Sequence, residues 1–212
     1  MSSTANDRPA KRSEARERLL ATASGLFYAE GINKVGVDRI VSASNVTLAT
    51  FYRHFPRKQD LVVAYLNAAH DLEAQRMEGL AERARGRELL RAIGDDIIAM
   101  IGSPDFRGCA FINAAAEFED PEDPVRRVVA EHRQWYYERL RHSFADAGHP
   151  RPGNPARHFV MMRDGAVTAG YIDSPASVRR TFTRGVEGLL RSIDTTPATA
   201  TDRSPPHARD PR

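Results

Sequence analysis

The chain has 212 residues, which is enough for one elongated domain or two small ones with a real core. The single cysteine, Cys109, excludes an internal disulfide, and no Cys/His group has the spacing of zinc ligands, so we expect neither a metal nor a cofactor. The formal net charge of +3 is unevenly placed, because residues 1–60 hold ten Lys/Arg against six Asp/Glu and the remainder is close to neutral. This distribution favours a nucleic-acid-binding N-terminal part on a body with another task.

The polar N-terminal segment lacks the apolar stretch of a signal peptide, and no run approaches 18 uninterrupted apolar residues. We therefore expect a soluble, cytoplasmic protein with no membrane partner. Residues 1–12 and 195–212 are rich in Ser, Thr, Pro and charge, which predicts disordered tails.

Between these tails the hydrophobic pattern is helical and has no convincing strand, so the predicted fold class is all-α. The predicted helices cover residues 13–30, 37–44, 48–55, 58–84, 87–102, 108–118, 125–144, 156–172 and 175–193. We divide the chain into a three-helix, helix-turn-helix DNA-binding domain over 13–60 and a helical regulatory and dimerisation domain over 61–194.

Local signals mark the ends of the first helices. Ser13 can cap the first helix, and Gly31 can end it in a left-handed turn. Asn45 tolerates the left-handed conformation that a tight turn needs, and Thr47 can cap the following helix. Pro56 should stop that helix, because a residue before proline is disfavoured in helical geometry. Two short helices joined by such a turn form a helix-turn-helix.

We expect Ile40, Val46 and Phe51 to lock the two helices together, leaving a polar outer face. The candidate DNA-binding residues are Thr47, Leu48, Thr50, Tyr52, Arg53 and His54, with Lys58 placed for a phosphate just beyond Pro56. Hydroxyls at a helix N-terminus and a phenol, imidazole and guanidinium beyond it are groups that bind phosphates and bases. The alternative is a capped surface helix whose Tyr52 and His54 only pack on neighbours.

The segment from about Arg16 to Leu66 resembles the DNA-binding domain of the TetR family of bacterial transcriptional regulators. The resemblance is carried by Phe27, Gly31, Val46, Phe51, Tyr52, His54, Phe55, Pro56 and Lys58. It implies that Thr47, Thr50, Tyr52, His54 and Lys58 contact chiefly operator phosphates, and that Leu48 and Arg53 touch base edges. Three positions depart from the family pattern, namely Gly36, Asn45 and Ala49, and Gly36 removes one expected phosphate-binding side chain.

The resemblance also implies a homodimer on a palindromic operator, since one recognition helix reads too few base pairs. The last two predicted helices carry apolar faces that suit an intersubunit four-helix bundle, although the same residues could form ordinary core. These residues are Phe159, Val160, Met161, Val167, Tyr171, Val178, Phe182, Val186, Leu189, Leu190 and Ile193.

The middle of the body is expected to bind an unknown small-molecule effector. Candidate ligand-binding residues are Asn113 and Glu117 together with seven residues that could line an apolar cavity, namely Met100, Phe106, Phe111, Trp135, Tyr136, Met162 and Tyr171. Asn113 and Glu117 share a helical face and could orient a ligand, or they could cap or pair with neighbours such as Arg126. We interpret Cys109 as a small buried hydrophobic residue, and a redox role stays open. His132 and Trp135 are either core residues or cofactor contacts.

The sequence thus predicts a DNA-binding transcriptional regulator, and specifically a repressor released from its operator by a ligand. A nonspecific helical DNA-binding or interaction protein without an inducer is the alternative, and activation instead of repression stays open. We do not expect an enzyme, because the chain has no nucleophile elbow, phosphate-cradling glycine loop or metal set.

Overall fold

The computed structural model describes residues 7–195, with side chains over 14–194. This part of the chain contains helices and no strand, which confirms the all-α prediction. The helices are α1 (Asp7–Glu30), α2 (Val37–Ser44), α3 (Leu48–His54), α4 (Lys58–Ala81), α5 (Gly86–Ile101), α6 (Ala110–Glu117), α7 (Pro124–Asp146), α8 (Gly153–Ile172) and α9 (Pro175–Thr195).

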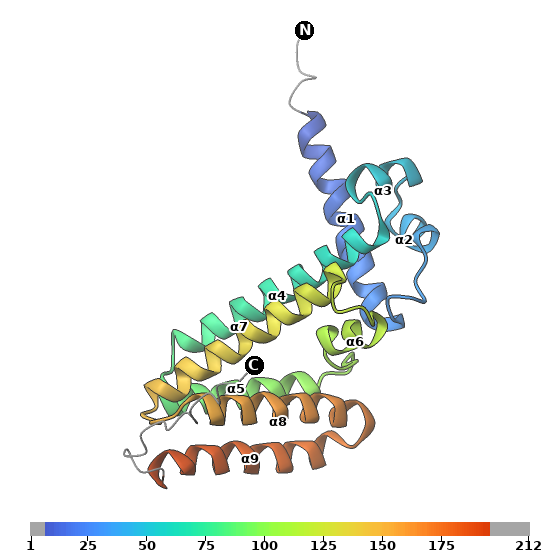
Figure 1. The fold of residues 1–212 in the computed structure, drawn as a ribbon. Coiled ribbons are helices and arrows are strands. Elements are labelled where there is room, and N and C mark those ends of the chain that lie inside the picture. Colours follow the sequence, from blue (N-terminus) through green and yellow to red (C-terminus); the bar gives the residue numbers. More distant parts are fainter. Residues whose placement is uncertain (1–6, 196–212) are drawn as a thin grey trace, which may run out of the picture.

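The helices form a small head and a larger body (Figure 1). Helices α1, α2 and α3 pack together as the head, and α4 runs from the head into the body, where it lies along α7. Helices α5, α8 and α9 pack against one another at the far side, and the short α6 lies between this layer and the end of α1. The head is therefore joined to the body through α4 and through the surroundings of α6.

The start of the first helix differs from the sequence prediction. Helix α1 begins at Asp7, so residues 7–12, expected to be part of a tail, are helical and Ser13 lies inside the helix instead of capping it. Lys, Arg and Ala in this segment are good helix formers, and Pro9 falls in the first turn, where its missing N–H costs nothing. Residues 1–6 and 196–212 lie outside the described part.

One continuous hydrophobic core runs through head and body. Leu19, Phe27, Ile40 and Phe51 are buried in the head, and Leu66, Leu90, Leu140 and Phe159 continue the core into the body. Helices α5 and α8 approach closely at Gly170, where an added Cβ would lie 2.4 Å from Ile101 Cγ2. In the described residues, no helix is long and apolar enough to cross a bilayer.

Candidate DNA-reading helix and effector cavities

The turn between α2 and α3 is built as the local sequence predicts. Asn45 ends α2 with φ 51° and ψ 50°, the left-handed conformation that asparagine tolerates. Thr47 then caps α3, since its Oγ1 accepts a hydrogen bond from the backbone nitrogen of Thr50 at 3.1 Å. Phe51, fully buried, fixes α3 on the head core, and α3 ends at His54, two residues before Pro56. The predicted turn, cap and stop are confirmed.

The outer face of α3 presents a linked row of polar groups. The Oγ1 atoms of Thr47 and Thr50 lie 2.9 Å apart, and Arg53 donates a hydrogen bond to Thr50 Oγ1 at 3.2 Å. Leu48 and Tyr52 are close to half exposed, at 45% and 48%, and Tyr52 meets the ring of Phe51 edge-on. A surface helix of this length, with two hydroxyls at its N-terminus, has the dimensions of a major-groove reader.

Three of the predicted contact residues, Thr50, His54 and Lys58, are only partly exposed. His54 is half-buried, and the ammonium of Lys58 donates a 2.6 Å hydrogen bond to the carbonyl of Ile32. The Lys58 ammonium also lies 5.8 Å from the centre of the Phe27 ring, and burial lowers the pKa of Lys58 although Glu117 opposes this. In this structure Lys58 therefore holds the turn after α1 in place.

Two cavities adjoin each other where α1 meets the body. The first, called the central cavity, has a volume of about 470 Å³ and lies between α1, α4, α5, α6 and α8. It is lined by Ser24, Gly25, Tyr28, Tyr65, Ala68, Ala69, Leu72, Glu73, Arg76, Met100, Gly108, Cys109, Ala110, Phe111 and Arg163. This volume falls in the range of small-molecule sites.

The second, called the junction cavity, has a volume of about 380 Å³ and lies where the end of α1 meets α6 and α8. Tyr28, Tyr65, Gly108, Cys109 and Ala110 line both cavities and so form the wall between them. The Tyr28 hydroxyl crosses this wall, donating to the carbonyl of Gly108 at 3.0 Å and accepting from the nitrogen of Arg107 at 2.9 Å. A residue of the head thus lines both spaces.

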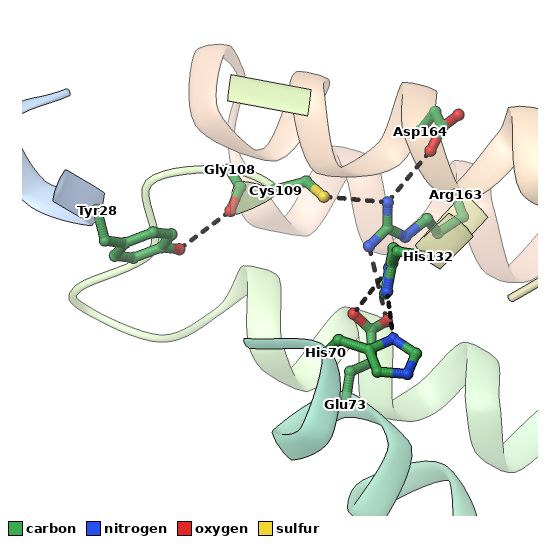
Figure 2. Close-up of polar contacts among 8 residues, drawn as sticks. All are labelled: Tyr28, His70, Glu73, Gly108, Cys109, His132, Arg163 and Asp164. Atoms are coloured by element: carbon green, nitrogen blue, oxygen red, sulfur yellow. Dashed lines mark hydrogen bonds and ion pairs between the residues drawn. The ribbon is translucent and has the colours of Figure 1, made fainter. Parts of the chain in front are cut away.

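A buried polar cluster forms the floor of the central cavity (Figure 2). Arg163 donates to Cys109 Sγ and to Asp164 at 3.3 and 3.2 Å, and its Nη2 lies 3.7 Å from Glu73. The other Glu73 oxygen lies 3.5 Å from His132 Nε2. Figure 2 shows that side chains from α4, α7 and α8 converge here from separate helices.

His132 is held neutral inside this cluster. Its ring stacks on Phe111 with centroids 3.5 Å apart, and its Nδ1 lies 3.0 Å from His70 Nδ1. Burial lowers the pKa of His132 to about 3, and the nearby Arg163 acts in the same direction. A neutral imidazole next to Glu73 leaves Arg163 as the cation of the cavity floor.

The nine predicted effector residues do not line one cavity, so the expectation of a single site made from them is wrong. Met100 and Phe111 line the central cavity, Asn113, Glu117 and Tyr171 the junction cavity, and Tyr136 a small cavity of about 20 Å³. Met162 lies in a groove on the outer side of α8 and α9, while Phe106 and Trp135 pack against the core. Helical periodicity identifies a buried face but not the element that covers it.

Asn113 and Glu117 both hydrogen-bond to backbone groups of neighbouring loop segments, and neither pairs with the arginines considered in the sequence analysis. Asn113 donates to the carbonyl of Arg107 at 3.0 Å. Glu117 accepts hydrogen bonds from the nitrogens of Ile32 and Asn33 at 2.9 and 2.6 Å. Glu117 therefore connects the end of α6 to the turn between α1 and α2.

The apolar faces predicted for a dimer interface mostly serve the protomer itself. Of the residues expected there, all except Met161 and Tyr171 are buried within the single chain. What remains on the outside is the groove between α8 and α9, called the outer groove, with a volume of about 420 Å³. Small residues, including Gly165, Ala169 and Gly185, line it beside Met162, and Met161 is 71% exposed.

Sequence reasoning missed several residues of these sites. Tyr28, His70, Glu73 and Arg163 all line or support the central cavity, yet none stood out in the sequence. For Arg163 a signal was available, because an arginine on the apolar face of a helix needs buried partners. Tyr28 carried no such signal, since its partner lies 80 positions away.

Comparison with known proteins places the chain in a family. The profile of "Bacterial regulatory proteins, tetR family" matches residues 19–65, and that of "Tetracyclin repressor-like, C-terminal domain" matches residues 86–157. Among curated proteins, the HTH-type transcriptional regulator LmrA of Bacillus subtilis (strain 168) is 26% identical over 60% of this chain and 72% of its own.

Solved structures agree with this assignment. A TetR-family transcriptional regulator from Streptomyces coelicolor is 46% identical, with a TM-score of 0.82 over 85% of this chain and 96% of its own. A putative TetR regulator from Streptomyces avermitilis is 26% identical, with a TM-score of 0.74 over 85% of this chain and 98% of its own. The chain belongs to the TetR family of bacterial regulatory proteins and is a DNA-binding transcriptional regulator.

Proposed function

We propose that this protein is a dimeric repressor that leaves a palindromic operator when a small molecule enters the central cavity. The observation that carries this proposal is Tyr28, which belongs to α1 of the head and lines the central cavity of the body. A ligand that contacts Tyr28 acts directly on the helix that supports α2 and α3. We further propose that the protein works in the cytoplasm, where its DNA lies.

In this proposal α3 enters the major groove of DNA. Thr47 and Thr50 bind phosphate at the helix N-terminus, Tyr52 and His54 contact the backbone, and Leu48 and Arg53 meet base edges. The support is the linked row of Thr47, Thr50 and Arg53 on the outer face of α3, in which Thr47 and Arg53 are exposed and Thr50 is partly buried. Lys58 contributes by fixing the turn at Ile32, and its ammonium reaches a phosphate only if it gives up that hydrogen bond.

The dimer is proposed to form through the outer groove of α8 and α9. TetR-family regulators dimerise, and two recognition helices on a two-fold axis read half-sites separated by about one helical turn, roughly 34 Å. Gly165 has open space around its Cα, and the neighbouring Met161 is exposed. A second copy packed on these small residues would cover both.

The effector response is proposed to pass through three contacts between body and head. Tyr28 bonds to Gly108, Glu117 bonds to the turn at Ile32, and Gln59 donates to Asp123 at 2.6 Å at the start of α7. A ligand that changes the wall of the central cavity moves α6 relative to α1 and so changes the spacing of the two heads. The ligand shifts the equilibrium only by its differential affinity for the two arrangements.

A reporter gene tests the repressor proposal. A DNA site that the purified protein selects is placed over a promoter, and expression of the protein should lower reporter output, with Tyr52→Ala restoring it. A rise in output would make the protein an activator and overturn the repressor proposal. Equal binding to the selected site and random DNA, in place of the preference of about 1,000-fold expected of a specific regulator, would favour a nonspecific binder.

A further inference from the structure

The guanidinium of Arg163 is buried and incompletely satisfied. Arg163 is only 6% exposed, and a guanidinium carries five N–H donors that buried sites normally pair. Within the described residues, only Nη1 is hydrogen-bonded, to Cys109 and Asp164, and thiol sulfur is a weak acceptor. The Nη2 contact to Glu73 is 3.7 Å, longer than a hydrogen bond, and Nε has no partner there.

One of the two acidic groups near Arg163 is shared with another arginine. Asp164 also forms an ion pair with Arg133 at 2.7 Å, so its negative charge only partly neutralises Arg163. Of the charged side chains that line the central cavity, Arg76 and Arg163 are cationic and Glu73 is anionic, which leaves one positive charge in excess. A low-dielectric cavity with such an excess stabilises an anion.

The rest of the central cavity is apolar and contains rings. Phe111 forms part of the floor and is held in place by its stacking on His132. Tyr65 and Met100 form walls, and Leu72, an exposed leucine, lies on the solvent side of the lining. The space therefore suits an apolar body of one to a few rings, with its polar end at Arg163.

We propose that the effector of the central cavity has an apolar aromatic body and one anionic group that binds the free donors of Arg163. A planar guanidinium donates two parallel hydrogen bonds to a carboxylate or sulfonate, and such charge-assisted bonds are about twice as strong as neutral ones. This inference rests on the proposed function, because it assigns a chemical class to the effector that the body binds.

Two dyes with one body test the inference. Anilinonaphthalene sulfonate carries the anion, and phenylnaphthylamine is the same ring system without it. Trp135 is the only tryptophan and contacts the His70 and His132 rings beneath the central cavity, so energy transfer from Trp135 reports a dye bound there. The sulfonate dye should bind about tenfold more tightly or better, as expected for charge-assisted hydrogen bonds.

The variants separate a direct contact from a general charge effect. Arg163→Gln should lower the affinity for the sulfonate dye about tenfold and change the affinity for the neutral dye by no more than about twofold. Arg133→Gln is the matched control, since it removes a neighbouring positive charge that does not line the cavity, and it should leave both dyes unchanged. If Arg163→Gln does not fold, Arg163→Lys is the substitute, because lysine keeps the charge but loses the planar pair of donors. It should still weaken binding of the sulfonate dye more than binding of the neutral dye.

Equal affinity for the two dyes in the wild-type protein, or an equal loss of sulfonate binding in Arg133→Gln, would overturn the inference. Arg163 would then be a structural cation whose free donors bind solvent, for instance in the adjoining cavity of about 20 Å³, which has room for one water. DNA binding is measured separately on the same preparations. If the dyes bind as predicted but the wild-type protein shows no sequence-specific DNA binding, only the proposed function is contradicted.

Discussion

Glu117, the last residue of α6, accepts a 2.9 Å hydrogen bond from the backbone nitrogen of Ile32 in the turn that precedes the helix-turn-helix. The same carboxylate accepts from Asn33, and Lys58 of α4 donates to the carbonyl of Ile32. The turn is therefore held from the body side by α6 and from the head side by α4. A displacement of the end of α6 therefore acts on this turn directly through the Glu117 side chain.

Glu117→Ala should loosen this turn without disturbing α3. Two hydrogen bonds to a carboxylate are lost at a partly exposed site, so the free energy of unfolding should fall by about 1–2 kcal/mol. Hydrogen exchange at the amides of Ile32 and Asn33 should become faster, while exchange in α3 should stay unchanged. Unchanged exchange at Ile32 would show that Glu117 does not hold the turn.

Thr47→Ala should destabilise the recognition helix by removing its cap. Loss of an N-cap hydroxyl costs about 1 kcal/mol, and the Thr47 Oγ1 bond to the nitrogen of Thr50 is such a cap. Thr47→Ser keeps the hydroxyl and serves as the control. Urea denaturation followed by circular dichroism should show lower stability for the alanine variant and near wild-type stability for the serine variant.

Tyr52→Phe and Lys58→Ala should both weaken DNA binding across sequences, but through different routes. Tyr52 is half exposed, so its phenylalanine variant should lose a phosphate contact and keep full stability, with an unchanged salt dependence because the lost hydroxyl is uncharged. Lys58→Ala also removes the bond to Ile32, so it should lower the melting temperature as well. If both variants bind the operator as tightly as the wild-type protein, the assignment of this surface to DNA binding is wrong.

If the protein dimerises through the outer groove, acidic substitutions in the groove and in the core should have different effects. Met161→Glu combined with Gly165→Glu should give folded monomers, because Met161 is exposed and an added Cβ at Gly165 meets no atom within 4 Å. Leu190→Glu should instead unfold the chain, since Leu190 is buried within the protomer. Sedimentation together with circular dichroism separates the two. A folded dimer of the double variant would move the interface elsewhere.

The lowered pKa of His132 predicts that the folded protein loses stability in acid. Its pKa is lowered from 6.5 to about 3 in the folded chain, so between these pH values the unfolded chain binds more protons. The free energy of unfolding therefore rises with pH across this window, by at most about 1.4 kcal/mol per pH unit from this group. His132→Phe keeps the stacking on Phe111 and should show a shallower slope in urea titrations, whereas an equal slope would contradict the assignment.

The parts of the fold that local chemistry determines could be predicted from the sequence. Asn45, Thr47 and Pro56 each act through their own backbone or the next turn, and all three do what their residue types predict. The start of α1 was predicted too late, because charged residues next to a proline suit a helix as well as a tail. Such a segment gives no local signal of where the helix begins.

The cavities could not be predicted in the same way, because they depend on which helices meet. Tyr28 and Gly108, or Cys109 and Arg163, come together only through packing across the whole body. The apolar faces of α8 and α9 illustrate the same limit. Their periodicity is equally consistent with a partner subunit and with other helices of the same chain, and it is α7 that packs on α8 and α5 that packs on α9.

Selection of duplex DNA from a random-sequence pool by the purified protein most directly tests whether α3 reads an operator. We predict enrichment of an inverted repeat with half-sites about one helical turn apart, bound by two protomers and lost with Tyr52→Ala. Recovery of sequences with no common motif, or enrichment that Tyr52→Ala leaves intact, would contradict the assignment of α3 as the recognition helix of a sequence-specific regulator.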